Sequence, residues 1–130
     1  MIVVDASVAL AILLEEPEGD VFKAALLKSG GGVMSPVNHW EVLVRAQSVG
    51  GDIARNAAEA MLAAFGIEVA EMSSRHSRLA AEAQMRFGRG TPAKLNLGDC
   101  FAYALAATEG DGLLFKGDDF PKTDVKAALP

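Results

Sequence analysis

The sequence predicts an α/β fold in which helices cover both faces of a central, mostly parallel sheet. Short apolar runs that indicate strands alternate with longer segments in which apolar residues recur at helical spacing. Strands joined through helices pair in parallel, because such a connection returns the chain to the same edge of the sheet. With 130 residues, 51% of them hydrophobic, the chain can bury one substantial core but is short for two. We therefore expect a single domain over residues 1–130.

The first third of the chain predicts two short strands separated by helices. Residues 1–5 are an apolar run that ends in a carboxylate, which is typical of a buried strand with a charged C-terminal end. Ser7 is the expected N-cap of a helix that ends near Leu14. Helical spacing resumes over residues 18–27 and stops at three glycines, and residues 33–34 then predict a second strand.

The later elements begin and end at typical capping and breaking residues. A serine followed by a proline predicts a helix from Pro36 to about Val49, where two glycines break it. Asp52 is the expected cap of the helix that follows. That helix is expected to end near Phe65. The elements expected after it are a strand over 67–69, a helix from Ser73 or Ser74 to Phe87, a loop over 88–92, a helix over 98–108 and a strand over 113–115.

Four carboxylates occupy positions where α/β folds collect functional groups. Asp5 and Asp118 follow predicted strands, Asp99 begins an otherwise apolar helix, and Glu41 lies on a helix among bulky apolar residues. Each aspartate also has an ordinary structural explanation, as a helix cap, a turn residue or a first-turn acid favoured by the helix dipole. Glu41 fits such an explanation least, because it lies beyond the favourable first turn.

If these carboxylates converge, their mutual repulsion requires either protons or a bound cation. Hard oxygen ligands favour Mg²⁺ or Mn²⁺, while His39, His76 and Cys100 are too isolated in the sequence to indicate a zinc site. Magnesium held by a few carboxylates binds and polarises phosphates. The acids therefore indicate phosphoryl chemistry.

The charges of the chain are unevenly distributed. The net charge of −5 argues against a protein that coats nucleic acid nonspecifically. Residues 75–94 nevertheless carry five cations against the single acid Glu82, a local balance of 5 minus 1, or +4, so the rest of the chain carries −9. The five cations are Arg75, Arg78, Arg86, Arg89 and Lys94. They form either an RNA-binding patch that faces phosphates or an ordinary solvated helix face.

Composition also bears on where the protein acts. The single cysteine permits no intrachain disulfide, and no segment is apolar over a transmembrane length. The apolar N-terminus lacks the cationic start of a signal peptide. We expect a soluble, cytoplasmic protein with no membrane partner.

Four segments together resemble the PIN-domain ribonucleases, and within them the VapC-type toxins of prokaryotic toxin–antitoxin pairs. The segments are Ile2–Val8 (IVVDASV), Ser35–Glu41 (SPVNHWE), Leu95–Ala106 (LNLGDCFAYALA) and Leu114–Phe120 (LFKGDDF). They span the whole chain in the family's order, and the segment around Asp99 is the most specific. The resemblance implies a PIN-like three-layer α/β/α fold.

Matching positions imply roles for individual residues. The family's three principal acids, which hold one or two Mg²⁺ or Mn²⁺ ions, match Asp5, Glu41 and Asp99. The fourth family acid often lies where this chain has Gly117. Asp118 is therefore the expected fourth acid, and Asp119 is the second candidate. Ser7 matches a small hydroxyl that can bond a carboxylate or a metal-bound water, besides its possible role as a helix cap.

The resemblance implies Mg²⁺-dependent endonucleolytic cleavage of single-stranded or looped RNA by activated water, with 5′-phosphate and 3′-hydroxyl products. It also implies a VapB-like protein antitoxin and a homodimer. Four apolar residues of the early helices are expected mainly to pack in the core, and they are also the candidates for an antitoxin groove. These residues are Leu10, Leu13, Leu14 and Phe22.

Two other functions are compatible with parts of the pattern. A phosphatase of the haloacid-dehalogenase kind also begins with a strand and an aspartate, but it needs a second aspartate two residues later, where this chain has Ser7. A noncatalytic PIN-like module would bind RNA or protein without cleavage. Such modules typically lose acids, whereas this chain keeps them at all positions apart from the shifted fourth.

Overall fold

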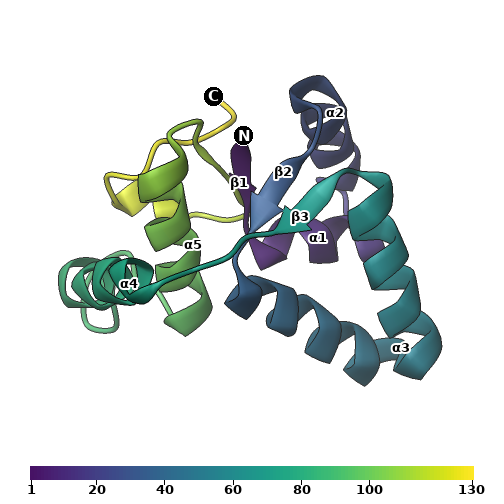
Figure 1. Cartoon of the computed structure of the whole chain (residues 1–130), viewed down its shortest axis with the longest axis horizontal. Helices are drawn as coiled ribbons and strands as arrows, with labels where there is room; N and C mark the ends of the chain where they lie inside the picture. The colour runs from purple at the N-terminus through teal and green to yellow at the C-terminus, as the bar shows by residue number, and fades with distance from the viewer.

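Figure 1 shows a computed structural model of residues 1–130, built around one four-stranded sheet. The strands are β1 (Ile2–Val4), β2 (Gly32–Met34), β3 (Ile67–Val69) and β4 (Leu113–Leu114). Their order across the sheet is β3-β2-β1-β4, and every neighbouring pair is parallel. Because β1 is an inner strand, the residue that follows it lies within the carboxyl edge of the sheet.

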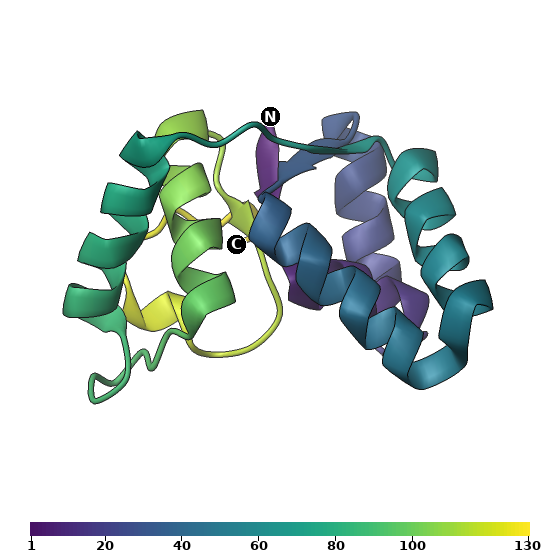
Figure 2. The ribbon, with the colours of Figure 1, turned by 60° about the horizontal axis from the view of Figure 1, so that its bottom comes forward.

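Five helices cover the two faces of this sheet. They are α1 (Ala6–Leu13), α2 (Gly19–Ser29), α3 (Pro36–Ala64), α4 (Ser74–Phe87) and α5 (Leu97–Glu109). Figures 1 and 2 show α1, α2 and α3 on one side of the sheet and the pair α4 and α5 on the other. The predicted three-layer α/β/α architecture is confirmed, and the sheet is wholly parallel.

Successive side chains of β1 and β4 pack into two different cores. Val4 of β1 and Leu114 of β4 pack with α1, α2 and α3, whereas Val3 and Leu113 pack with α4 and α5. Side chains of a strand alternate between its faces, so a strand buried on both sides must be apolar throughout. This requirement explains why β1 reads as an unbroken apolar run.

The two glycines of α3 bend the helix at the predicted position. Gly50 (φ −143°, ψ 18°) and Gly51 (φ 67°, ψ −156°) leave the helical conformation, and Gly51 adopts a positive φ that favours glycine. α3 therefore consists of two helical arms separated at these glycines, as predicted, and Figure 1 shows the arms meeting at an angle. Asp52, the expected cap of the second arm, accepts a 3.0 Å hydrogen bond from the Gln47 amide across the bend.

The structure corrects the predicted cap of α1. Asp5, not Ser7, is the N-cap, and its side chain accepts from the backbone N–H of Ser7. An aspartate with extended backbone in front of a helix is a strong cap. The predicted strand over 1–5 is correspondingly shorter, since β1 ends at Val4.

The C-terminal segment covers one edge of the sheet, which the sequence did not predict. Ala127 pairs in parallel with Leu113, and the Leu113 N–H donates to the Lys126 carbonyl at 2.8 Å. A short 3-10 helix, η1 (Phe120–Lys122), connects this segment to β4. Pairing along the β4 edge removes free backbone groups that would otherwise template association. No helix in the structure has the length and apolar character needed to cross a membrane.

Candidate active site

Asp5 is held in the middle of the carboxyl edge by the elements on either side of it. Its backbone N–H donates to Leu114 of β4 at 3.0 Å, and its side chain is only 5% exposed. Ser7 donates twice to Asp5 Oδ2, from its hydroxyl at 2.6 Å and from its backbone N–H at 3.2 Å. Both hydrogen bonds end on Asp5 Oδ2, so Asp5 Oδ1 accepts no hydrogen bond from Ser7.

Glu41 lies on the first arm of α3, and a buried asparagine orients its carboxylate. The Asn38 amide donates to Glu41 Oε1 at 2.8 Å and to the Gly98 carbonyl of α5 at 3.1 Å. Asn38 is fully buried, and its own amide oxygen accepts from the Ser35 hydroxyl at 2.9 Å. Asn38 thereby fixes the Glu41 side chain relative to α5.

Gly98 allows the Glu41 carboxylate to lie against the start of α5. A Cβ atom on Gly98 would overlap the carboxylate group of Glu41. The backbone conformation of Gly98 is helical, so the need for glycine here is spatial. α3 and α5, which are distant in sequence, therefore contact each other at a position that has no room for a side chain.

Asp99 is anchored at the first turn of α5 by reciprocal hydrogen bonds with Asn96. The Asn96 side chain accepts from the Asp99 N–H at 2.9 Å, and the Asp99 carboxylate accepts from the Asn96 N–H at 3.0 Å. This capping box explains the first-turn position of Asp99 in structural terms. It does not explain why the acid is half-buried rather than solvated.

The pKa values of the acids show that they lie within one electrostatic neighbourhood. Burial raises the pKa of Asp5, against the hydrogen bonds from Ser7, and the charge of Glu41 raises it further. Burial and the charge of Asp99 raise the pKa of Glu41. Burial raises the pKa of Asp99 to about 6, with further contributions from the charges of Asp5 and Asp119. Three carboxylates from β1, α3 and α5, together with Asp119 after β4, therefore repel one another.

The loop after β4 approaches this group of acids through two anchors. The Lys116 N–H donates to the Ser7 hydroxyl at 3.0 Å, so the loop is tied to the residue that bonds Asp5. The Lys116 ammonium bridges Glu16 and Glu18, at 3.1 Å and 3.0 Å, in the connection between α1 and α2. Of the two acids in the loop, Asp119 contributes to the raised pKa of Asp99.

The donor set suits a hard divalent cation, but the side chains are not arranged as a finished metal site. All the converging groups are carboxylates, which are ligands that Mg²⁺ and Mn²⁺ accept. No three His, Cys, Asp or Glu side chains of the chain lie close enough together to hold a metal ion. Glu41 and Asp99 are instead turned to donors of their own helices, Asn38 and Asn96. These bonds engage Glu41 Oε1 and Asp99 Oδ2, so a shared cation would be bound through the second oxygen of each carboxylate while the donors stay in place.

Comparison with known proteins places this arrangement in a family. The model of the PIN domain matches residues 2–126. The chain belongs to the PIN-domain family. It is 38% identical over 128 residues to ribonuclease VapC42 of Mycobacterium tuberculosis, covering 97% of this chain and 98% of that protein. It is 34% identical over 129 residues to ribonuclease VapC28 of the same organism, covering 98% of this chain and 97% of the relative.

A solved structure supports the same fold assignment. The crystal structure of Mycobacterium tuberculosis VapC20, a toxin that cleaves the sarcin–ricin loop, superposes with a TM-score of 0.75. The two chains are 19% identical, and the match covers 96% of each. The resemblance found in the four sequence segments is therefore confirmed, and this PIN domain is related to the VapC ribonucleases over nearly its full length.

The cationic stretch of this PIN domain does not form one patch. α4 and α5 run antiparallel, because His76 contacts Thr108 at one end and Leu95 bonds Phe87 near the other. Arg75 and Arg78 consequently lie at the end of the helix pair remote from Asp99, and α4 is about 21 Å long. Arg89 and Lys94 belong to the loop that leads into α5, on the side of Asp99.

Arg86 has a structural partner within the PIN domain. Its guanidinium pairs with Asp124 at 3.0 Å and lies over the Phe87 ring, and Tyr103 donates to the same carboxylate. This contact ties the C-terminal segment to α4 and α5. Among the five predicted RNA-binding cations, Arg86 is thus the one whose charge is already paired.

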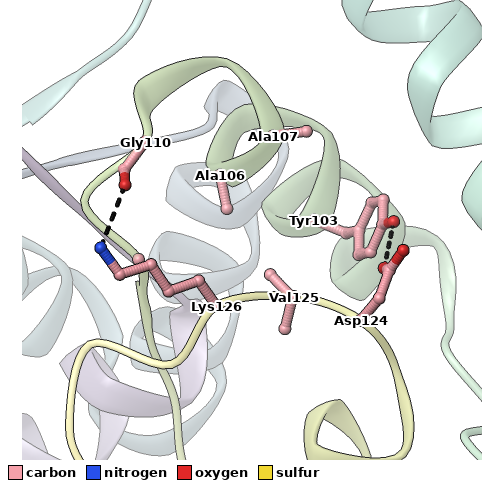
Figure 3. A pocket seen from close by; sticks show the side chains of 8 residues that line it. Tyr103, Ala106, Ala107, Gly110, Asp124, Val125 and Lys126 are labelled. Carbon is pink, nitrogen blue, oxygen red and sulfur yellow. Dashed lines mark hydrogen bonds between the residues drawn. The ribbon is translucent and has the colours of Figure 1, made fainter.

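A cavity of about 200 Å³ beside this contact is separate from the acids. Tyr103, Asp124 and Lys126 line it, and Figure 3 shows the Tyr103–Asp124 and Lys126–Gly110 hydrogen bonds at its walls. The cavity lies toward the C-terminal end of α5, whereas Asp99 lies at the N-terminal end. It contains no cluster of acids and we assign it no chemistry.

The apolar candidates on the early helices differ in their burial. Phe22 is 4% exposed and belongs to the core, which agrees with core packing rather than a groove for this residue. Leu13 and Leu14 are half-buried, and Leu13 packs against the same core. Leu10 lines an open groove that also contains Glu41.

Sequence reasoning missed the residues that support the acids. Asn38 occurs in a segment that resembles the family, but nothing in the sequence indicates a bond to Gly98, sixty residues away. The sequence likewise indicates no role for Lys116, although this residue fixes the loop that carries Asp118 and Asp119. The signal in the sequence that could have identified Asn38 is its spacing, since an amide side chain three residues before an acid on a predicted helix lies on the same face.

Proposed function

We propose that this PIN domain is a divalent-metal-dependent endoribonuclease, the toxin component of a type II toxin–antitoxin pair. The observation that carries the proposal is the convergence of Asp5, Glu41 and Asp99 at the carboxyl edge of the sheet, where each raises the pKa of another. Buried carboxylates that repel one another favour a bound cation. The names of the related VapC ribonucleases support RNA as the substrate.

Asp5 and Asp99 are the proposed principal metal ligands, with Glu41 and an acid of the β4 loop completing the site. We propose Asp119 rather than Asp118 as that fourth acid, because its charge acts on Asp99. When bound, Mg²⁺ or Mn²⁺ would polarise the scissile phosphate and stabilise the charge that develops on it. Ser7 and Asn38 hold the Asp5 and Glu41 carboxylates in place.

The proposed reaction is hydrolysis of an RNA phosphodiester bond. The oxygen of water bonds to phosphorus, the bond from phosphorus to the 3′ oxygen breaks, and the 3′ oxygen takes a proton. Glu41 is the proposed acceptor of the proton that the attacking water loses, and its half-buried carboxylate with a raised pKa supports this role. The products would carry 5′-phosphate and 3′-hydroxyl ends.

A VapB-like protein antitoxin and a second copy of the chain are the proposed protein partners. Relationship to VapC ribonucleases supports both, and the cytoplasm is the proposed compartment. A noncatalytic PIN-like module remains the rival function. The retention of the three converging acids favours the enzyme over that rival.

Metal-controlled cleavage of RNA tests the proposal. Purified protein is stripped with EDTA, dialysed, and incubated with total RNA before and after addition of Mg²⁺ or Mn²⁺. We expect cleavage only after metal is restored, with 5′-phosphate ends that allow direct adaptor ligation. Metal-independent cleavage would contradict the proposed chemistry, and the absence of cleavage with every metal and RNA would favour the noncatalytic module.

A further inference from the structure

The groove between α1 and α3 places an exposed aromatic ring beside the proposed active site. Six residues line it: Leu10, Trp40, Glu41, Val44, Arg45 and Ser48. Its volume of about 400 Å³ falls in the range of sites that bind small organic groups. Glu41 belongs both to this groove and to the cluster of acids.

Trp40 is exposed in a way that packing does not explain. Its side chain is 61% exposed, although it is the only tryptophan of the chain and directly precedes Glu41. Val44, one helical turn later, is 47% exposed on the same ridge of α3. An indole ring that is open to solvent next to an active site offers a flat surface for another ring.

Arg45 adds a free positive charge to the same groove. It makes no hydrogen bond or ion pair in the structure, even though Glu41 lies four residues before it on the helix, at ion-pairing spacing. The Glu41 carboxylate is instead turned to Asn38 and Gly98. The guanidinium therefore remains available to an anion that enters the groove.

We propose that this groove binds one nucleotide of the RNA next to the cleaved bond, with its base stacked on Trp40 and a phosphate paired with Arg45. The proposal rests on the proposed ribonuclease function and names a specificity-determining residue for it. An aromatic face, an apolar floor and a cation match the three parts of a nucleotide better than they match an apolar peptide segment. Stacking accepts every base, so Trp40 selects an unpaired nucleotide rather than one sequence.

The fluorescence of the single tryptophan reports this contact directly. The Asp5→Asn variant, in which the RNA should stay intact, is titrated with a single-stranded RNA of 12 mixed nucleotides. A ribose-phosphate strand of the same length without bases is the matched ligand. We expect quenching of Trp40 by the RNA and none by the base-free strand. Equal responses to both strands, or no quenching by RNA that binds in a separate filter assay, would overturn the proposal.

Kinetics of cleavage provide the second readout. Trp40→Ala should raise KM for RNA roughly 5- to 150-fold, the effect of losing one stacked base, and Trp40→Phe should recover part of the loss. Arg45→Ala should raise KM and reduce the salt dependence of binding by about one counterion. Ile53→Ala, which removes an 84% exposed apolar side chain elsewhere on α3, is the control and should leave KM unchanged.

The outcomes separate this proposal from the proposed function. If wild-type protein cleaves RNA and Trp40→Ala has an unchanged KM, the nucleotide subsite is wrong while the ribonuclease assignment stands. If wild-type protein does not cleave any RNA, the ribonuclease assignment itself fails. If Trp40→Ala keeps its KM but escapes inhibition by a protein partner, the groove is a protein-docking surface and the nucleotide proposal is overturned.

Discussion

The side-chain amide of Asn38 donates a 2.8 Å hydrogen bond to Glu41 Oε1, and the same amide bonds the Gly98 carbonyl at 3.1 Å. One buried polar group thereby sets the position of a proposed catalytic acid relative to the helix that carries Asp99. The acids of this site depend on supporting residues that hold them close together in spite of their mutual repulsion.

Replacement of Asn38 by alanine should impair both activity and stability. Glu41 would lose its orienting donor, so the rate of RNA cleavage should fall roughly 10- to 100-fold. The Gly98 carbonyl would lose the bond from Asn38 and the buried Ser35 hydroxyl would lose its acceptor, so the free energy of unfolding should fall by about 1–3 kcal/mol. Cleavage assays and urea denaturation measure the two effects. Ile53→Ala, which changes an 84% exposed side chain on the same helix, is the control, and equal behaviour of the two variants would contradict the role of Asn38.

A methyl group at position 98 should displace the Glu41 carboxylate. The Cβ atom of Gly98→Ala would overlap that carboxylate, so we expect weaker Mn²⁺ binding and slower cleavage. The overpacking should also reduce stability by about 1–3 kcal/mol. Titration calorimetry with Mn²⁺ measures the first effect. Leu97→Ala changes the neighbouring, 63% exposed side chain and should bind Mn²⁺ like the wild type.

The stability of the metal-free protein should fall as pH rises toward neutrality. The pKa of Asp99 is about 6 in the folded protein against an ordinary value of 3.8, so the folded state binds the proton more tightly. This contribution to stability is therefore full below about pH 4 and is lost as pH rises through about 6. Denaturant unfolding of wild type and Asp99→Asn over pH 4–8 should show that their difference grows in favour of Asp99→Asn at high pH. A pH-independent difference would show that burial and the neighbouring acids do not raise the pKa of Asp99 in the folded protein.

Arg86 should act on stability rather than on RNA binding. Its ion pair with Asp124 fixes the C-terminal segment, so Arg86→Ala should lower the melting temperature and leave KM for RNA unchanged. Arg89→Ala, in the loop before α5, should raise KM without a comparable change in melting temperature. Tyr103→Phe, which removes one hydrogen bond to Asp124, should destabilise the protein in the same direction as Arg86→Ala. A raised KM for Arg86→Ala would instead show that the Arg86 side chain takes part in RNA binding.

Local features of the sequence predicted the parts of the fold that local interactions determine. The apolar run before Asp5 identified β1, and the Gly50-Gly51 pair identified the bend in α3. The carboxyl edge of a parallel sheet then made the convergence of strand-end acids a reasonable expectation. The positions of Glu41 and Asp99 on predicted helices made them further candidates, and the family resemblance then matched Asp5, Glu41 and Asp99 to the family's three principal acids.

The supporting contacts could not be predicted, because they join residues that are far apart in sequence. The Asn38–Gly98 bond spans 60 residues and the Arg86–Asp124 pair spans 38. The choice between Asp118 and Asp119 depended on how the loop after β4 folds back, which Lys116 fixes through Ser7 and two glutamates. The prediction of Ser7 rather than Asp5 as the N-cap of α1 is a smaller error, since the Ser7 hydroxyl donates a hydrogen bond to the Asp5 carboxylate.

Cleavage of RNA by the Asp5→Asn variant is the most direct measurement of the central claim. The substitution keeps the size of the side chain and a helix-capping oxygen, so the variant should fold and bind its partners. Asp20→Asn, which changes a 96% exposed aspartate on α2, is the matched control. In Mg²⁺, we predict that Asp5→Asn cleaves RNA roughly 100-fold or more slowly than wild type, while Asp20→Asn cleaves at the wild-type rate. Cleavage by Asp5→Asn at the wild-type rate would contradict the account.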